Sequence, residues 1–163
     1  MIDEHDIFAR LREDHHKHRD LLSRIAASDG TDDERLELFE EFTLEVKAHA
    51  AAEEQAVYST MMRKPATTDE VRHSVAEHHE IEELLNDMAA TDIGSGEWME
   101  KFRQLDHDYR HHIEEEEDEH FPEFEKLLTD ADREHMRAVF ERRKRAEKAD
   151  AEVKPERMED AKE

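Results

Sequence analysis

A histidine and a glutamate interrupt the apolar face of one predicted helix at a spacing that suits metal binding. His49 and Glu53 continue the three- and four-residue spacing of Phe39, Phe42 and Val46, so they fall where buried side chains are expected. Histidine and glutamate four residues apart lie on one helix face about one turn apart. Both can then bind one metal ion, or the glutamate can bridge two.

The same arrangement recurs later in the chain. His112 and Glu116 continue the spacing of Phe102, Leu105 and Tyr109. Tyr109 is expected to fill core space beside His112, where its hydroxyl could reach a metal ligand. We therefore expect two helices to present His-x-x-x-Glu pairs to the interior.

An internal repeat relates these pairs. The segments DHHKHRDLL (14–22) and EHHEIEELL (77–85) align at an offset of 63 residues, and each places a histidine on an apolar stripe. The same offset relates His15 to His78, His49 to His112, and Glu53 to Glu116. We interpret the chain as two similar helix pairs, each contributing two histidines and one glutamate to a shared centre.

The energetics of burial favour metal ions at this centre. Two carboxylates and four imidazoles among apolar side chains would each cost several kcal/mol if left uncompensated. Imidazole and carboxylate ligands suit iron, manganese or zinc, and the chain has no cysteine for a thiolate site. Six ligands with two bridging carboxylates match two metal ions with positions left open for small molecules.

The elements that must position these ligands are helices. Gly30, Pro65, Gly94 and Gly96 lie in polar clusters that divide the chain into long segments. Thr67 with Glu70 has the spacing of a capping box. We predict four helices, over residues 4–28, 31–62, 68–91 and 96–121. Short connections between them predict an all-α, up-down-up-down four-helix bundle.

The end of the chain differs from the bundle. Pro122 is expected to kink or restart the fourth helix because proline lacks a backbone N–H. We predict a four-helix domain over residues 1–128 and a peripheral helix over residues 129–149. Residues 150–163 are charged and poor in apolar side chains, so we predict a frayed, disordered tail there.

Composition limits the partners. The chain has 47 acidic and 24 basic residues and a net charge of −23, which repels nucleic acid and anionic membranes. The opening residues MIDEHDIFAR lack the regions of a signal peptide, and no uncharged stretch has membrane-spanning length. We therefore expect a cytoplasmic protein with a small-molecule partner, and a separate protein partner if it signals.

The sequence resembles the hemerythrin-like family, also called the HHE cation-binding domain. The resemblance covers roughly residues 8–127 and rests on DHHKHRDLL, HAAAEEQAVY, AEHHEIEELL and HHIEEEEDEHFP. It implies a four-helix bundle around two non-haem iron ions joined by an oxo or hydroxo bridge. By the resemblance the iron ligands are His15, His49, Glu53, His78, His112 and Glu116, with Glu53 and Glu116 bridging.

The sequence departs from the oxygen-carrying members at two positions. Those members carry a histidine one turn before the third-helix ligand, where this chain has Ser74; its nearest candidate, His73, lies off the stripe unless a π-bulge turns it inward. We favour a surface or outer position for His73. The carriers also place the last carboxylate five residues after its histidine, which would select Glu117, whereas the repeat selects Glu116.

Other interpretations concern the whole site. A ferritin-like carboxylate protein would use Glu-x-x-His pairs, which Glu70–His73 and Glu117–His120 match, but neither pair lies on an apolar stripe. Tyr58 is expected to be a packing residue. The expected function is binding or sensing of dioxygen, peroxide or nitric oxide. The alternatives are an enzyme that disproportionates peroxide or reduces nitric oxide, and an iron storage or donation protein.

Overall fold

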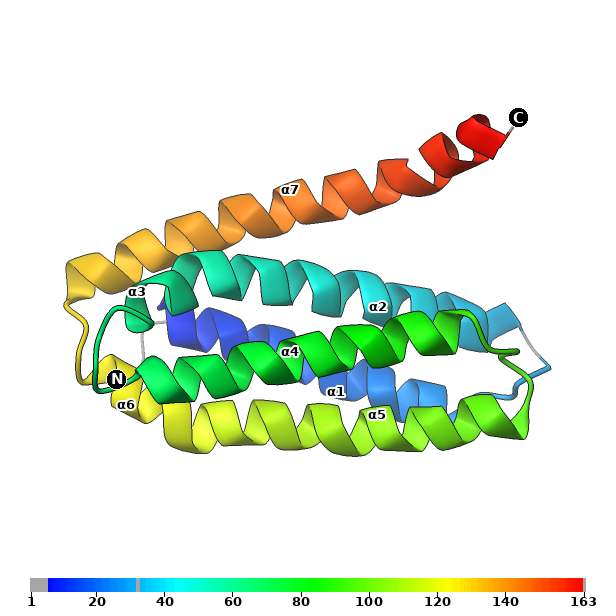
Figure 1. The fold of residues 1–163 in the computed structure, drawn as a ribbon, viewed down its shortest axis with the longest axis horizontal. Coiled ribbons are helices and arrows are strands. Elements are labelled where there is room, and N and C mark those ends of the chain that lie inside the picture. Colours follow the sequence, from blue (N-terminus) through cyan, green and yellow to red (C-terminus); the bar gives the residue numbers. More distant parts are fainter. Residues whose placement is uncertain (1–5, 32, 163) are drawn as a thin grey trace.

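Every regular element in the described part of the chain is helical, as predicted. The computed structural model describes residues 6–31 and 33–162, with side chains described up to residue 151. Four long helices, α1 (Ile7–Ala27), α2 (Asp33–Glu53), α4 (Thr68–Ala89) and α5 (Gly96–Glu115), run alternately up and down (Figure 1). The predicted four-helix bundle is therefore confirmed.

Two π-helical turns interrupt the second and fourth bundle segments. The turn η1 (Glu54–Tyr58) follows α2 and leads into the short helix α3 (Ser59–Met61). The turn η2 (Glu116–His120) follows α5 and leads into α6 (Phe121–Glu125), which has Pro122 in its first turn. A missing N–H is tolerated in a first turn. Pro122 therefore restarts the helix directly after the π turn, as the sequence predicted.

The helix starts have specific backbone partners. The Asp6 carboxylate accepts from Phe8 N at the start of α1, and Ser95 Oγ accepts from Trp98 N at the start of α5. The expected capping box at α4 is not formed, because Thr67 makes no side-chain cap hydrogen bond. Its hydroxyl instead donates to the carbonyl of Met61 at 2.7 Å, which ties the α3–α4 connection together.

The apolar core consists of two clusters. One includes Leu22, Phe42 and Phe102, and the other includes Phe8 and Phe121. Histidines and glutamates in the middle of each bundle segment separate the clusters along the helices. The polar residues therefore lie within the bundle and between two apolar layers, a position that excludes bulk water.

The last helix, α7 (Asp130–Lys162), packs outside the bundle along α2 and also contacts α1 (Figure 1). It buries Met136 and Phe140 in the second apolar cluster. The tail predicted over residues 150–163 lies almost wholly beyond the described side chains, and its disorder stays a prediction. None of the helices described here combines the length and apolarity needed to cross a bilayer.

Candidate metal centre

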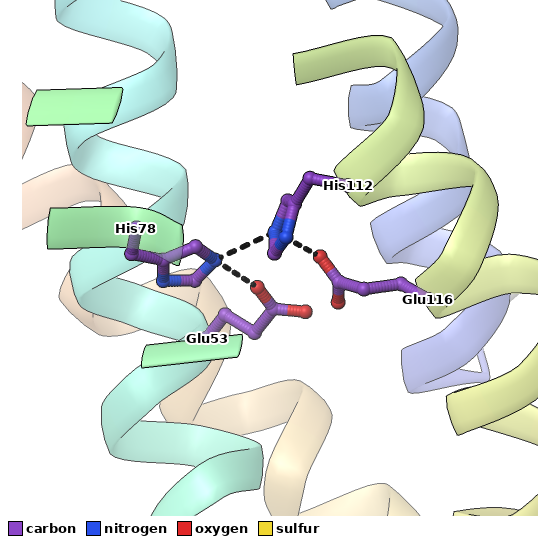
Figure 2. A group of neighbouring side chains, drawn as sticks. All are labelled: Glu53, His78, His112 and Glu116. Carbon is purple, nitrogen blue, oxygen red and sulfur yellow. Dashed lines mark hydrogen bonds and ion pairs between the residues drawn. The ribbon is translucent and has the colours of Figure 1, made fainter. Parts of the chain in front are cut away.

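Four of the six predicted ligands converge at one point between α2, α4 and α5 (Figure 2). His112 Nε2 lies 2.7 Å from Glu116 Oε1, and His78 Nε2 lies 3.3 Å from Glu53 Oε1. The two imidazole nitrogens face each other at 3.0 Å. Ligand atoms of all four residues lie within 4.8 Å of one another, as they would around a shared metal ion.

The remaining two predicted ligands lie on the other side of Glu53. His49 Nε2 is 3.8 Å from Glu53 Oε1, and the His49 ring packs 5.2 Å from the ring of His15. Both histidines are buried. Glu53 therefore contacts histidines from both halves of the repeat, as a bridging carboxylate must.

The buried polar atoms at this centre lack hydrogen-bond partners. Those without one include both ring nitrogens of His15, His49 Nε2, both Glu53 oxygens and Glu116 Oε1. Such a group is rare in a protein interior, because each orphaned atom costs free energy. Coordination by metal cations would satisfy all of these atoms, so the residues present fit a metal centre.

Each of the four histidines also has a carboxylate near its other ring nitrogen. His49 Nδ1 donates to Asp14 Oδ2 at 2.8 Å, and His112 Nδ1 donates to Glu77 Oε1 at 3.0 Å. The Nδ1 atom of His15 lies 3.6 Å from Glu117, and that of His78 lies 3.9 Å from Glu54. A carboxylate in this position fixes the ring so that Nε2 points to the metal.

These outer carboxylates obey the same repeat as the ligands. Asp14 and Glu77 are 63 residues apart, and so are Glu54 and Glu117. Reasoning on apolar stripes missed Asp14, Glu54 and Glu77, because an outer partner of a ligand does not itself lie on the stripe. The offset of 63 residues, applied to every carboxylate beside a ligand, would have found them.

The π turns explain how neighbouring glutamates serve different histidines. Each turn begins at or directly after a ligand glutamate, and the wider turn adds a residue to the inward face. Glu116 therefore lies in the centre, while Glu117 contacts His15 and forms an ion pair with Arg19 from outside. Of the two carboxylates considered for this position, the structure places Glu116 among the ligands.

The electrostatics differ between the two halves. Burial alone would lower the pKa of His112, but the charge of Glu116 and hydrogen bonds to Glu116 and Glu77 raise it to about 9. For His49 burial outweighs the hydrogen bond to Asp14, and the pKa falls to about 4. Burial and the adjacent charge of Glu116 raise the pKa of Glu53. The two buried carboxylates repel each other unless a cation lies between them.

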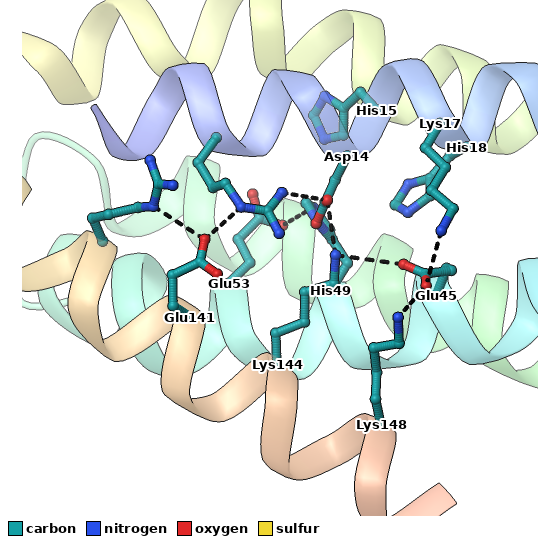
Figure 3. A network of polar contacts seen from close by, with 12 residues as sticks. Asp14, His15, Lys17, His18, Glu45, His49, Glu53, Glu141, Lys144 and Lys148 are labelled. Atoms are coloured by element: carbon teal, nitrogen blue, oxygen red, sulfur yellow. Dashed lines mark hydrogen bonds and ion pairs between the residues drawn. The ribbon is translucent and has the colours of Figure 1, made fainter. Parts of the chain in front are cut away.

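The C-terminal helix reaches this centre through a lysine (Figure 3). Lys144 Nζ lies 2.8 Å from Asp14 Oδ1 and 3.4 Å from Glu45 Oε2, and all three side chains are buried. Arg10 also donates to Asp14. Burial would raise the pKa of Asp14, but the hydrogen bond from His49 and the Lys144 ammonium hold it well below its usual range. Asp14 is thus a charged acceptor for His49.

Two tyrosine hydroxyls lie near the ligands. Tyr58 Oη donates to Glu116 Oε2 at 3.1 Å, so Tyr58 does more than pack. The hydroxyl of Tyr109 bonds to Nδ1 of His18 at 2.7 Å, and no hydrogen bond links it to a ligand among the described residues. The contact considered for Tyr109 is thus made by Tyr58.

The structure places His73 apart from the buried ligands. Its side chain is 52% exposed and lies near Glu77 and Glu115 on the surface of α4. No π-helical turn occurs within the 22 residues of α4, so nothing rotates His73 inward. Ser74 takes the buried position beside it and bonds to His120.

A cavity of about 610 Å³ between α2 and α4 reaches the centre from one side. Its lining includes the ligands His49 and His78 together with Tyr109. Apolar side chains, among them Ile81 and Leu85, form another part of the wall. A small molecule that enters this cavity would meet both halves of the ligand set.

Comparison with known proteins places this arrangement among related chains. Residues 6–124 match the family model described as the hemerythrin HHE cation binding domain. The fold is similar to the crystal structure of a hemerythrin HHE cation binding domain-containing protein from Mycobacterium kansasii, with a TM-score of 0.81. The two chains are 22% identical, and the similarity covers 94% of this chain and 92% of the other. No curated protein matched the chain.

Proposed function

Because the chain belongs to the hemerythrin HHE cation-binding domain family, we propose that its buried centre holds two non-haem iron ions. The proposed ligands are His15, His49, Glu53, His78, His112 and Glu116, with both glutamates bridging. One observation carries the proposal. Unpartnered imidazole and carboxylate atoms face one buried space, while outer carboxylates lie beside the opposite ring nitrogens.

We propose that this centre binds or senses dioxygen or a related small molecule, such as peroxide or nitric oxide. Bound ferrous iron supplies the electrons that such ligands accept. The cavity between α2 and α4 gives a ligand of this size a path to His49 and His78. Its apolar wall at Ile81 and Leu85 limits water near the site, which slows loss of electrons to solvent-derived oxidants.

A second candidate function, disproportionation of peroxide, is supported by the two tyrosines. Tyr109 lines the cavity and shares a hydrogen bond with the buried His18, while Tyr58 donates to Glu116. Burial and the charge of Glu116 raise the pKa of both phenols, so both keep their protons at neutral pH. Groups that hold and pass protons beside a redox centre are what turnover of peroxide requires.

The test combines a metal count with a spectrum. Protein purified with iron is expected to contain two ions per chain. When the reduced protein is exposed to air, a new charge-transfer band should appear and should disappear when oxygen is removed. A normal helical spectrum with one ion or none would contradict the dinuclear centre. Irreversible bleaching with consumption of added peroxide would favour the enzyme.

Matched variants test the ligand assignment. His49→Leu and His112→Leu each remove a proposed ligand and should abolish two-ion binding. His16→Leu changes an exposed histidine next to His15 and should leave the metal count unchanged. Equal losses in all three variants would overturn the assignment.

A further inference from the structure

A second group of imidazoles and carboxylates lies at the surface between α4 and η2. His73 Nε2 is 3.1 Å from Glu115 Oε1, and His120 Nε2 is 3.4 Å from the same oxygen. Glu77 adds a carboxylate 3.3 Å from His73. Glu119 groups with Glu115 and His120 on the other side. None of these five residues belongs to the six proposed ligands of the buried centre.

The spacing of these atoms matches a coordination shell. Two ligand atoms each about 2.1 Å from one metal ion lie about 3.0–3.4 Å apart in octahedral or tetrahedral geometry. The contacts of Glu115 with His73 and His120 fall in that range. His73 is half exposed, so its ring is free to turn toward an ion held by Glu115.

The buried member of the group is already oriented. His120 is 4% exposed, its Nδ1 lies 3.1 Å from the hydroxyl of Ser74, and its ring stacks on Phe124. These contacts leave Nε2 directed toward Glu115. One nitrogen held by the protein and the other presented to a carboxylate is the arrangement of a metal-binding histidine.

The space beside His120 is lined by negative charge. A cavity of about 320 Å³ is bounded by Asp69, Glu70, His73, Glu115, Glu119 and His120, with no lysine or arginine in its wall. Glu70 Oε2 is buried there without a hydrogen-bond partner. Among the described side chains, no lysine or arginine forms an ion pair with Glu70, Glu77 or Glu115. The carboxylates therefore lack a compensating cation.

The repeat shows what is missing. Asp14, which orients His49, is neutralised by Arg10 and by Lys144 from α7. Its counterpart Glu77, which orients His112, has only the imidazoles of His112 and His73 as partners. One half of the molecule thus has two fixed cations behind its outer carboxylate, and the other half has a cavity lined by acids. A bound cation would supply this half with the charge that Lys144 supplies to the first.

We propose that His73, Glu115 and His120 form a peripheral site for a divalent transition-metal ion, with Glu77 and Glu119 at its edge. The mixture of imidazole and carboxylate suits Mn²⁺, Fe²⁺ or Zn²⁺ rather than Ca²⁺ or Mg²⁺. An ion there lies one carboxylate away from the buried centre, because Glu77 Oε1 contacts both His73 and His112.

The test counts Mn²⁺ bound by protein whose buried centre is already loaded. Electron paramagnetic resonance of free Mn²⁺ gives the number and affinity of ions bound beyond those in the centre. The wild-type protein is expected to bind one such ion. The variant His73→Gln should bind it at least tenfold more weakly. The matched control, His79→Gln, removes an exposed histidine of α4 that pairs only with Glu83, and should bind as the wild type does.

A second measurement locates the ion. Mn²⁺ should broaden the imidazole nitrogen resonances of His120 at concentrations that leave those of the exposed His107 unchanged. Equal Mn²⁺ affinity in the wild type, His73→Gln and Glu115→Gln would overturn the proposal, and so would a wild type that binds no ion beyond the centre. Because the metal content of the centre is measured in the same samples, failure of the dinuclear assignment leaves the difference between His73→Gln and His79→Gln unaffected.

Discussion

The Nδ1 atoms of His49 and His112 decide which way these two ligands point. Each donates to a carboxylate, Asp14 or Glu77, and each therefore turns Nε2 inward. The proton on Nδ1 also selects the tautomer that can bind a metal. The geometry of the centre thus depends on two residues that do not belong to it.

Glu77→Gln is expected to weaken metal binding without unfolding the chain. The amide keeps the shape of the side chain but loses the charge that aligns His112, and loss of such an outer partner costs roughly 10–100-fold in affinity. Glu80→Gln, an exposed carboxylate on the same helix, is the control. Competition with a chelator of known affinity measures both. An unchanged affinity in Glu77→Gln would show that packing alone orients His112.

The six ligands could be predicted at this scale because each lies where an apolar residue should be. Tyr58 could not, since an aromatic residue on a buried face is fully explained by packing until its hydroxyl is seen to donate to Glu116. His120 was also missed. Its burial depends on the π turn that precedes it, and an ideal helical period does not include that turn.

Among the elements, α7 has the greatest effect on the centre from outside the bundle. Its apolar residues Met136 and Phe140 were expected to anchor a peripheral helix, and they do pack into the core. The sequence carries no sign that Lys144 would be buried, because one lysine among many on a charged helix resembles a solvated residue. Only the packing of α7 against α1 and α2 brings it to Asp14.

Lys144→Met is expected to destabilise the protein. The substitution keeps most of the side-chain volume but leaves Asp14 with one cation fewer and removes a partner of the buried Glu45. Loss of one partner from a buried pair costs roughly 3–5 kcal/mol. Lys126→Met, which removes an exposed pair with Glu123, should cost under about 1 kcal/mol. Denaturant unfolding of both variants measures the difference, and equal midpoints would contradict the structural role of Lys144.

The whole bundle is stabilised by its apolar clusters and is strained at its polar centre. Helix content, the four segments and their order were predictable because glycine, proline and apolar spacing act locally. The cavity between α2 and α4 and the acid-lined cavity at η2 were not, since both depend on distances between segments far apart in the chain.

The metal-free protein is expected to be most stable near pH 6.5. His112 has a folded pKa of about 9, above its unfolded value, so its contribution is complete at low pH and is lost as pH rises toward 9. His49 has a folded pKa of about 4, so stability is lost as pH falls from about 6.5 toward 4. Thermal unfolding across this range measures the curve. In His112→Asn the alkaline decline should be absent; if it persists, another group causes it.

Because the outer carboxylates, the ligands and the π turns all recur at one offset, the chain carries its binding instructions in duplicate. A duplicated site can diverge by halves: one copy keeps the inherited function while its twin accumulates change. Here the first copy has recruited a lysine from α7, and the second has kept a cluster of acids. A lineage that shares this architecture is therefore able to retune one iron position while the other is left as it was.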